Sequence, residues 1–317
     1  MSNKKALCPI CGSNKSEIIY RVAGHHRRDI RPEVSIGRCM KCKTIFLAEA
    51  DHFFQEDLYS YYKQYIGAKI EDLVSPLTLV SYDRVLKRLC KITNIQNILD
   101  VGCGKGEFVW AARNSGYAIK GIELSLEAVS VARSFNLPVQ QHSLFSPALD
   151  SSSWNAITMF EVIEHVENPV AMIQRATDLL APGGVLYLTT PNYDSLDRLC
   201  LGEKWNVFHP EHIIYFSTRG LARLVRQHEP RLRLIAVESN NISPQLFGFV
   251  RSLFRLPYLG KRNLKSSGYI DDHVVAPDLR TISEGTSLLR SLKRLINLTL
   301  TIMGMGSTTI LIAHKKD

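Results

Sequence analysis

Ile98-Leu-Asp-Val-Gly-Cys-Gly-Lys-Gly106 is the stretch that decides the fold of this chain. Its first half is a short apolar run, typical of a buried strand, and its second half is a glycine-rich turn. The turn predicts a helix over 107–114 directly after it. A strand, a glycine-rich turn and a helix in this order are typical of sheets that bind a nucleotide at their carboxyl edge.

The residues after this stretch continue to alternate between strands and helices. Apolar runs predict further strands over 119–122, 156–160 and 185–190, and Ser125 is placed to cap the helix after the first of them. Asn168 and Pro169 predict a helix start between the last two. Such alternation predicts an α/β fold with a mostly parallel sheet and helices on both faces.

Length and charge set the wider limits. The chain has 317 residues, which suggests roughly two domains. Residues 1–50 and 240–317 each carry a net charge of +6, out of +9 for the whole chain. A basic surface of this kind fits nucleic acid, an anionic substrate, an anionic membrane surface or no ligand at all. No signal peptide or membrane-spanning run is apparent, and we expect a cytoplasmic protein.

Four cysteines are paired near the N-terminus, in two Cys-x-x-Cys motifs separated by 27 residues. Two such motifs allow four thiolates to converge on one zinc ion, and because protein atoms fill all four positions the site is expected to be structural. The predicted ligands are Cys8, Cys11, Cys39 and Cys42.

Five segments in order resemble the class I S-adenosylmethionine-dependent methyltransferase family. They are Leu99-Asp-Val-Gly-Cys-Gly-Lys-Gly106, Gly121-Ile-Glu-Leu-Ser125, Phe160-Glu-Val-Ile-Glu-His-Val166, Leu180-Ala-Pro-Gly-Gly184 and Leu188-Thr-Thr-Pro-Asn192. The resemblance runs from about residue 97 to 238 and resumes at the last strand. It implies a Rossmann-like, mostly parallel seven-stranded sheet and S-adenosylmethionine as cofactor.

The resemblance also implies a set of cofactor-binding residues. Asp100 and the glycines would cradle the methionine part, Glu123 would hold the ribose hydroxyls, and Ser143 with Leu144 would flank the adenine. The full set is Asp100, Gly102, Gly104, Gly106, Glu123, Leu124, Ser143, Leu144 and Phe160.

Two histidine segments are candidates for the chemistry at the acceptor. Phe208-His-Pro-Glu-His-Ile-Ile-Tyr-Phe-Ser217 resembles a segment of deoxysugar C-methyltransferases, which implies His212 as general base with Glu211 as its partner. Glu161-Val-Ile-Glu-His165 followed by a later histidine is instead similar to metal-dependent O-methyltransferases acting on ubiquinone precursors or RNA 3′ ends. That likeness implies a Mg²⁺ ion held by Glu161, Glu164, His165 and His212. We rank base catalysis by His212 slightly ahead, with His165 as a further catalytic candidate.

The predicted domains are a zinc ribbon over 1–47, a helical linker over 48–96 and a methyltransferase domain over 97–317 with a helical insertion at 239–307. Residues 244–303 combine basic and apolar positions, which fits two helices that form a lid or a homodimer contact, or peripheral contact with a membrane.

The expected function is methyl transfer to a small polar acceptor, a nucleotide sugar or a glycan. An RNA methyltransferase is the alternative among enzymes, so nucleic acid is not excluded as a partner. A non-catalytic ligand-binding protein on the same fold is the alternative from another class.

Overall fold

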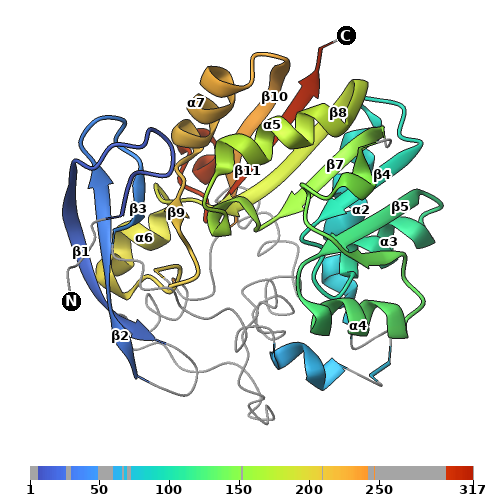
Figure 1. Cartoon of the computed structure of the whole chain (residues 1–317), viewed down its shortest axis with the longest axis horizontal. Helices are drawn as coiled ribbons and strands as arrows, with labels where there is room; N and C mark the ends of the chain where they lie inside the picture. The colour runs from blue at the N-terminus through green and yellow to red at the C-terminus, as the bar shows by residue number, and fades with distance from the viewer. Residues whose placement is uncertain are drawn as a thin grey trace. The chain divides into compact units, whose positions relative to one another are not determined.

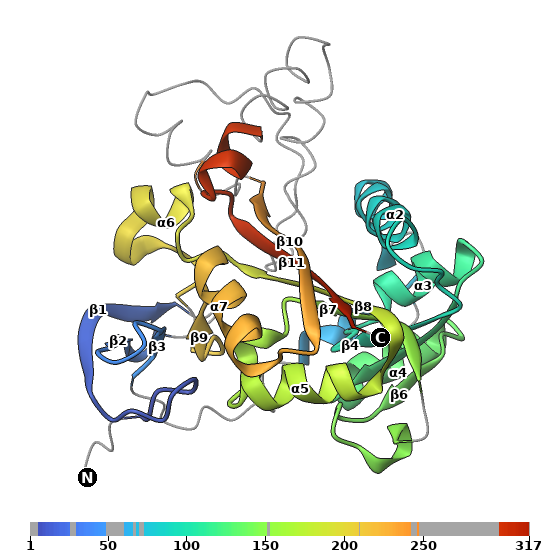
Figure 2. The same ribbon diagram turned by 90° about the horizontal axis from the view of Figure 1, so that it is seen from above.

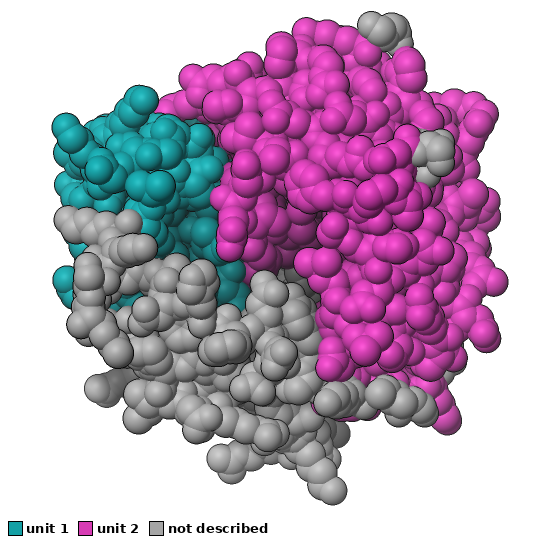
Figure 3. Space-filling view, viewed as in Figure 1, with its two compact units in different colours: residues 1–50, 191–219, 238–309 teal, residues 51–190, 220–237, 310–317 magenta. Residues whose placement is uncertain are grey.

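The computed structural model describes residues 6–25, 30–48, 60–65, 68–69, 73–150, 153–208, 210–241, 246 and 298–316. The chain forms two compact units, coloured separately in Figure 3. Unit 1 comprises residues 1–50, 191–219 and 238–309, and unit 2 comprises residues 51–190, 220–237 and 310–317. Both are discontinuous in sequence, whereas the sequence predicts domains that follow one another along the chain.

Unit 2 is built on a seven-stranded sheet (Figure 1) in the order β10-β11-β8-β7-β4-β5-β6. The strands are β4 (Asn97–Val101), β5 (Ala118–Glu123), β6 (Val139–Gln141), β7 (Trp154–Phe160), β8 (Leu180–Pro191), β10 (Leu232–Asn240) and β11 (Thr308–Lys315). The five strands from β4 to β8 pair in parallel. The predicted mostly parallel seven-stranded sheet is therefore confirmed.

Helices cover both faces of this sheet. Figure 2 shows α2 (Pro76–Cys90) and α3 (Glu107–Asn114) on one face, and α5 (Pro169–Leu179) with α7 (Thr218–His228) on the other. The described residues of this unit also form α4 (Leu126–Ser134) and the 3₁₀ turns η2 (Ser60–Tyr65), η3 (Pro147–Leu149) and η4 (Ile163–His165).

The predicted helix starts of this unit are correct. Ser125 Oγ accepts the N–H of Ala128 at the start of α4, and Asn168 Oδ1 accepts that of Ala171 at the start of α5. Pro169 occupies the first turn of α5, where the missing N–H has no cost.

Unit 1 contains a smaller sheet in the order β1-β2-β3-β9. The strands are β1 (Ser16–His25), β2 (Ile30–Cys39), β3 (Ile45–Leu47) and β9 (Ile214–Tyr215), and the unit also holds α6 (Leu196–Leu201) and η5 (Gly202–Lys204). β9 comes from a segment 167 residues after β3 and adds a fourth strand to the N-terminal ribbon. Sequence analysis did not anticipate this pairing.

A clamp of hydrogen bonds ties together the two ends of the predicted insertion. Ser307 N donates to Asn241 O at 3.1 Å, and Gly306 N donates to Ser239 Oγ at 2.9 Å. The buried amide of Asn192 donates to the carbonyls of Gly304 and Gly306 at 2.9 and 2.8 Å. The chain therefore leaves and re-enters the fold at one fixed point.

Several expectations lie outside the described residues. Almost all of 244–297 does, including the basic and apolar positions considered for a lid, a dimer contact or membrane contact. Among the residues that the structure does describe, no helix is both long and apolar enough to cross a bilayer.

Candidate active site

The glycine-rich turn joins β4 to α3 with a backbone that favours glycine. Gly102, Gly104 and Gly106 all have positive φ, at 65°, 52° and 85°. A Cβ on Gly106 would stand 2.7 Å from Leu137 Cδ1, so a side chain there would force Leu137 to shift. Gly106 precedes the first turn of α3, and no side chain caps that helix end. The N–H groups in the first turn of a helix have no partner within that helix, and they suit a polar or anionic ligand.

Glu123, at the end of β5, holds this turn in place. Its Oε2 accepts the N–H of Gly104 at 2.9 Å, and its Oε1 accepts those of Leu124 and Ser125 at 2.7 and 2.9 Å. The resemblance implies that this carboxylate binds the ribose, and three backbone hydrogen bonds give it a structural role as well. Each oxygen can accept more than one hydrogen bond, so the two roles are compatible.

Asp100, the last acidic residue before the turn, is buried at the end of β4. Its Oδ1 accepts the hydroxyl hydrogen of Thr158, on the neighbouring strand β7, at 2.6 Å. Burial raises the pKa of Asp100 to about 7, the Thr158 hydrogen bond opposes that rise, and the charge of Glu123 adds to it. A cation placed beside this carboxylate would stabilise its ionised form.

The 3₁₀ turn η2 lies against the glycine-rich turn. The Tyr62 hydroxyl stands 3.1 Å from the position of a Cβ on Gly104, so a side chain there would meet it. Lys105 Nζ lies 4.2 Å from the centre of the Tyr65 ring and 3.1 Å from Glu107 Oε1. The sequence predicts a helical linker over 48–96, and the structure places two tyrosines of this segment beside the candidate cofactor loop.

The other predicted cofactor residues differ in their exposure. Leu124 is exposed and Ser143 is half-buried, whereas Leu144 is buried in the core and its neighbour Phe145 is exposed. An exposed apolar side chain can contact an adenine ring, and of these two neighbours Phe145 has the exposed one. The Phe160 ring packs in an aromatic cluster with Tyr82, Phe108 and Tyr187.

The acidic segment after β7 is strained and buried. Glu161 has φ of 53°, which a residue with a side chain rarely adopts. Glu164 is buried, accepts the Thr190 hydroxyl at 2.9 Å through Oε2, and has Oε1 4.0 Å from His165 Nε2. Burial and the charge of Glu161 raise the pKa of Glu164 well above its ordinary value.

His212 lies just before β9, in unit 1, and is half-buried like its neighbour Glu211. Its Nδ1 lies 2.8 Å from the carbonyl oxygen of Val207. A carbonyl can only accept, so Nδ1 carries the hydrogen and Nε2 is the basic nitrogen of the neutral ring. Glu161, Glu164 and His165 belong to unit 2, and His209 lies outside the described residues.

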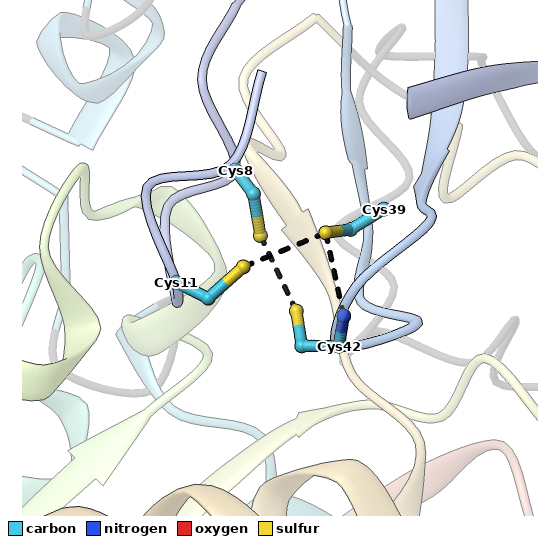
Figure 4. A group of neighbouring side chains, drawn as sticks. All are labelled: Cys8, Cys11, Cys39 and Cys42. Atoms are coloured by element: carbon cyan, nitrogen blue, oxygen red, sulfur yellow. Dashed lines mark hydrogen bonds between the residues drawn. The ribbon is translucent and has the colours of Figure 1, made fainter. Parts of the chain in front are cut away.

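The four predicted zinc ligands converge (Figure 4). The sulfur atoms of Cys8 and Cys42 are 3.5 Å apart, as are those of Cys11 and Cys39, and all four lie within 4.8 Å of one another. In a tetrahedral site with Zn–S bonds of about 2.3 Å, neighbouring sulfurs are roughly 3.8 Å apart. The donor set therefore fits zinc in both chemistry and spacing.

The two cysteine turns have matching backbones. Gly12 N donates to Cys8 O at 2.8 Å and Lys43 N donates to Cys39 O at 3.0 Å, and both Gly12 and Lys43 have φ of 65°. Burial raises the pKa of Cys8 and of Cys11. Burial also acts to raise the pKa of Cys39, but N–H groups of Cys42 and Lys41 outweigh it and lower that pKa to about 6. One thiolate is thus available near neutral pH.

Comparison with known proteins identifies the family. A family model described as a methyltransferase domain matches residues 68–229, half of the chain. A ubiquinone biosynthesis O-methyltransferase of Xanthomonas campestris is 37% identical over 102 residues, which is 30% of this chain and 43% of that protein. One of Paraburkholderia xenovorans is 31% identical over 144 residues, 42% of this chain and 60% of that protein. The chain thus spans about half the length of the curated relatives it matches.

A solved structure supports the same fold. A methyltransferase from Galdieria sulphuraria superposes with a TM-score of 0.50 at 15% sequence identity, covering 82% of this chain and 99% of that one. With the family match, the glycine-rich turn and the strand order, this chain belongs to the class I S-adenosylmethionine-dependent methyltransferases.

Proposed function

We propose that this enzyme methylates a small polar acceptor, a nucleotide sugar or a glycan, with His212 as general base. The observation that carries the proposal is the hydrogen bond between His212 Nδ1 and the Val207 carbonyl. It fixes the tautomer in which Nε2 can take a proton. A neutral imidazole suits this role because its ordinary pKa lies near neutral pH.

S-adenosylmethionine, when bound, supplies a methyl group already activated by its sulfonium. Asp100, Glu123 and the N–H groups of the glycine-rich turn are the residues that would hold it, with Leu124 and Phe145 beside its adenine. Removal of an acceptor proton is then the step left to the protein. In the overall exchange the acceptor–hydrogen bond breaks, a bond from the acceptor to the methyl carbon forms, and the sulfur–methyl bond breaks. His212 Nε2 takes the proton and later releases it to water.

Substitution of His212 tests this proposal. Positioned base catalysis is worth about 100- to 10,000-fold, so His212→Ala should lower kcat by that order and leave cofactor affinity within about twofold. Glu123→Gln is the matched contrast, because it should weaken cofactor binding, measured by titration calorimetry, through loss of charge-assisted hydrogen bonds worth about 1.5 to 3 kcal/mol. Turnover by His212→Ala at the parental rate would show that the base is misassigned. The acceptor is found by screening nucleotide sugars, lipid-linked glycans and RNA with labelled cofactor.

Metal-dependent O-methylation is the second candidate. Two observations favour it: Glu161 and Glu164 bring two acidic groups together in a buried place beside His165, and the relatives are named as O-methyltransferases. Two close carboxyl groups share a proton or bind a cation. Activity lost to EDTA and restored by Mg²⁺ would favour this candidate, and activity that persists in EDTA with the cysteine site still loaded would favour the base.

We further propose that Cys8, Cys11, Cys39 and Cys42 bind one structural zinc ion. The proposal is supported by the convergence of four sulfurs and by the paired backbone turns beneath them. Metal analysis of the purified chain should give one zinc per chain.

A further inference from the structure

We call the four cysteines and the strands β1, β2 and β3 the tetracysteine module. The strand after His212, β9, belongs to the sheet of this module. In the β3–β9 pair, Ile45 lies opposite Tyr215 and Phe46 opposite Ile214, and the β9 residues are buried. Leu47 N also donates to Ile213 O at 2.9 Å. The backbone directly after His212 is therefore hydrogen-bonded to β3, and not to a neighbour in the cofactor-binding sheet.

β3 is in turn fixed to the cysteine site. It begins three residues after Cys42, and Cys39 N donates to Thr44 O at 2.8 Å across the turn. The Phe46 side chain is 1% exposed and packs in one cluster with Cys8 and Cys39. The same residue thus contacts the cysteines with its side chain and pairs with β9 through its backbone.

A second connection runs through aromatic rings. Tyr20 on β1 packs against Phe208 at 5.1 Å between ring centres, and Phe208 packs against Trp205 at 5.2 Å and Tyr215 at 5.3 Å. The His212 ring lies 6.3 Å from that of Tyr215. Phe208 follows Val207, whose carbonyl sets the His212 tautomer, so the packing that holds Phe208 also holds the acceptor of that hydrogen bond.

We infer that the tetracysteine module positions His212, so that the metal acts on catalysis through β3, β9 and the Tyr20–Phe208 contact. When bound, the ion would fix the two cysteine turns. Strands β3 and β9 and the Tyr20–Phe208 contact would then hold His212 in one position. This inference rests on the proposed role of His212. In this inference the module has a structural role, which is to support the histidine proposed as the base.

Fluorine NMR of 5-fluorotryptophan-labelled protein tests the connection without using activity. The chain has three tryptophans, of which Trp205 lies in the aromatic cluster of unit 1 and Trp110 and Trp154 lie in unit 2. Removal of zinc should move the Trp205 resonance, assigned with Trp205→Phe, and leave the other two in place. An unchanged Trp205 resonance in metal-free protein would overturn the inference. So would a collapse of all three signals, since zinc would then support the whole chain.

Kinetics on the same samples test the consequence. Zinc removal should lower kcat by about 100-fold or more, because misplacement of a catalytic group by only about 1 Å already costs that much, with cofactor affinity within about twofold of the parent. Tyr20→Leu should give a smaller loss of kcat with zinc retained, and Tyr20→Phe, which keeps the ring, should restore the parental rate. If the loss appeared in cofactor affinity and not in kcat, the inference would be wrong.

Nitrogen NMR of the His212 ring separates failure of this inference from failure of the proposed function. Zinc removal should alter the Nδ1 signal because the Val207 carbonyl loses its fixed place. If His212→Ala turns over like the parent, the proposed base is wrong, and a ring signal that still responds to zinc supports the positioning link. A ring signal that ignores zinc removal overturns the link whatever His212 does in catalysis.

Discussion

The tetracysteine module and the glycine-rich turn both depend on residues with positive φ, but different forces hold them. In the module, Cys8 and Cys39 pack with Phe46 in a small cluster, and four sulfurs meet at its centre. The glycine-rich turn lies over a large core formed by the sheet and by α2, α3 and α4. The small cluster at the cysteine turns contributes little stability to those turns without a metal, whereas the large core under the glycine-rich turn can hold that turn by itself.

The two regions also differ in how they hold charge. The module lowers the pKa of Cys39 with backbone N–H groups, which makes a thiolate ready for a cation. The turn instead keeps Asp100 buried and raises its pKa. We expect the two cysteine turns to need a bound ion in order to be well ordered, and the glycine-rich turn to be folded before any ligand binds. The predictions below test this contrast.

The largest effect is expected from Cys8→Ser/Cys39→Ser. Structural zinc contributes about 10 to 16 kcal/mol in small zinc domains, so the variant should lose zinc and the fold of the module. Calorimetry should show that unit 2 still unfolds cooperatively, and metal analysis should find no zinc. Cys200→Ser, at an exposed position in unit 1, is the control. Zinc retained by the double variant would contradict the assignment of the site.

Asp100→Asn tests whether ionisation of the buried Asp100 carboxyl lowers the stability of the folded chain. The pKa of Asp100 is about 7 in the folded chain and 3.8 when unperturbed, so between these values the folded protein holds a proton that the unfolded chain has lost. Stability without cofactor should therefore fall as pH rises from about 4 to 7. Asparagine does not ionise, so the variant lacks this penalty. The free energy of unfolding of the variant minus that of the parent should therefore grow by about 3 kcal/mol from pH 5 to pH 8.

Urea denaturation at both pH values, without cofactor, measures that advantage. Asp83→Asn removes a carboxylate at an exposed site paired with Lys87 and is the control. An equal advantage at pH 5 and pH 8 would mean that Asp100 is not the group responsible. Cofactor binding by the parent should also release protons near pH 7, because a nearby cation favours the ionised carboxylate.

Two glycines of similar backbone but different surroundings show how tightly the turn is packed. Gly106 and Gly116 have φ of 85° and 86°, yet a Cβ on Gly116 would meet nothing within 4 Å. Gly116→Ala should cost about 1 kcal/mol of unfolding free energy for backbone strain alone. Gly106→Ala should cost about 1 to 3 kcal/mol more, because its Cβ overlaps Leu137. Equal costs in urea denaturation would show that the turn yields to a side chain.

The smallest effect is expected from Lys43→Gly. Lys43 holds in the second cysteine turn the place that Gly12 holds in the first, at the same φ. Glycine removes the backbone strain of the folded chain, but it also increases the conformational entropy of the unfolded chain. The net gain in the free energy of unfolding of the zinc-loaded protein should be about 0.5 to 1 kcal/mol. Lys41→Gly, in the same turn but without positive φ, should lower stability. Thermal unfolding compares the two, and a loss of stability in Lys43→Gly would show that the lysine side chain contributes contacts of its own.

Sequence patterns predicted most of unit 2 because its signals are local. The glycine-rich turn, the caps at Ser125 and Asn168 and the apolar strands each lie within a few residues of what they determine. The convergence of the four cysteines was predictable for the same reason, since their spacing is itself the signal. The sequence alone does not say which of the two adjacent apolar residues Leu144 and Phe145 faces the core.

Unit 1 was much less predictable because its decisive contacts join distant parts of the chain. β9 is two residues long, too short for a periodic pattern, and it pairs with a strand far away in sequence. Nothing around Val207 indicates that its carbonyl binds His212. Thr158 and Tyr62 belong to no sequence motif. The contact of Thr158 with Asp100 is visible only once β7 is paired with β4, and that of Tyr62 with Gly104 only once η2 is placed against the turn.

The clamp at Asn241, Gly306 and Ser307 has a consequence for how this enzyme can change over generations. Because the ends of the intervening segment are already joined, doubling the length of that segment adds only about 0.6 kcal/mol of closure entropy. Mutation can therefore lengthen, shorten or replace the segment while the sheet and the cysteine module keep their structure. Recombination can therefore bring new segments to this site while the sheet and the cysteine module are inherited unchanged.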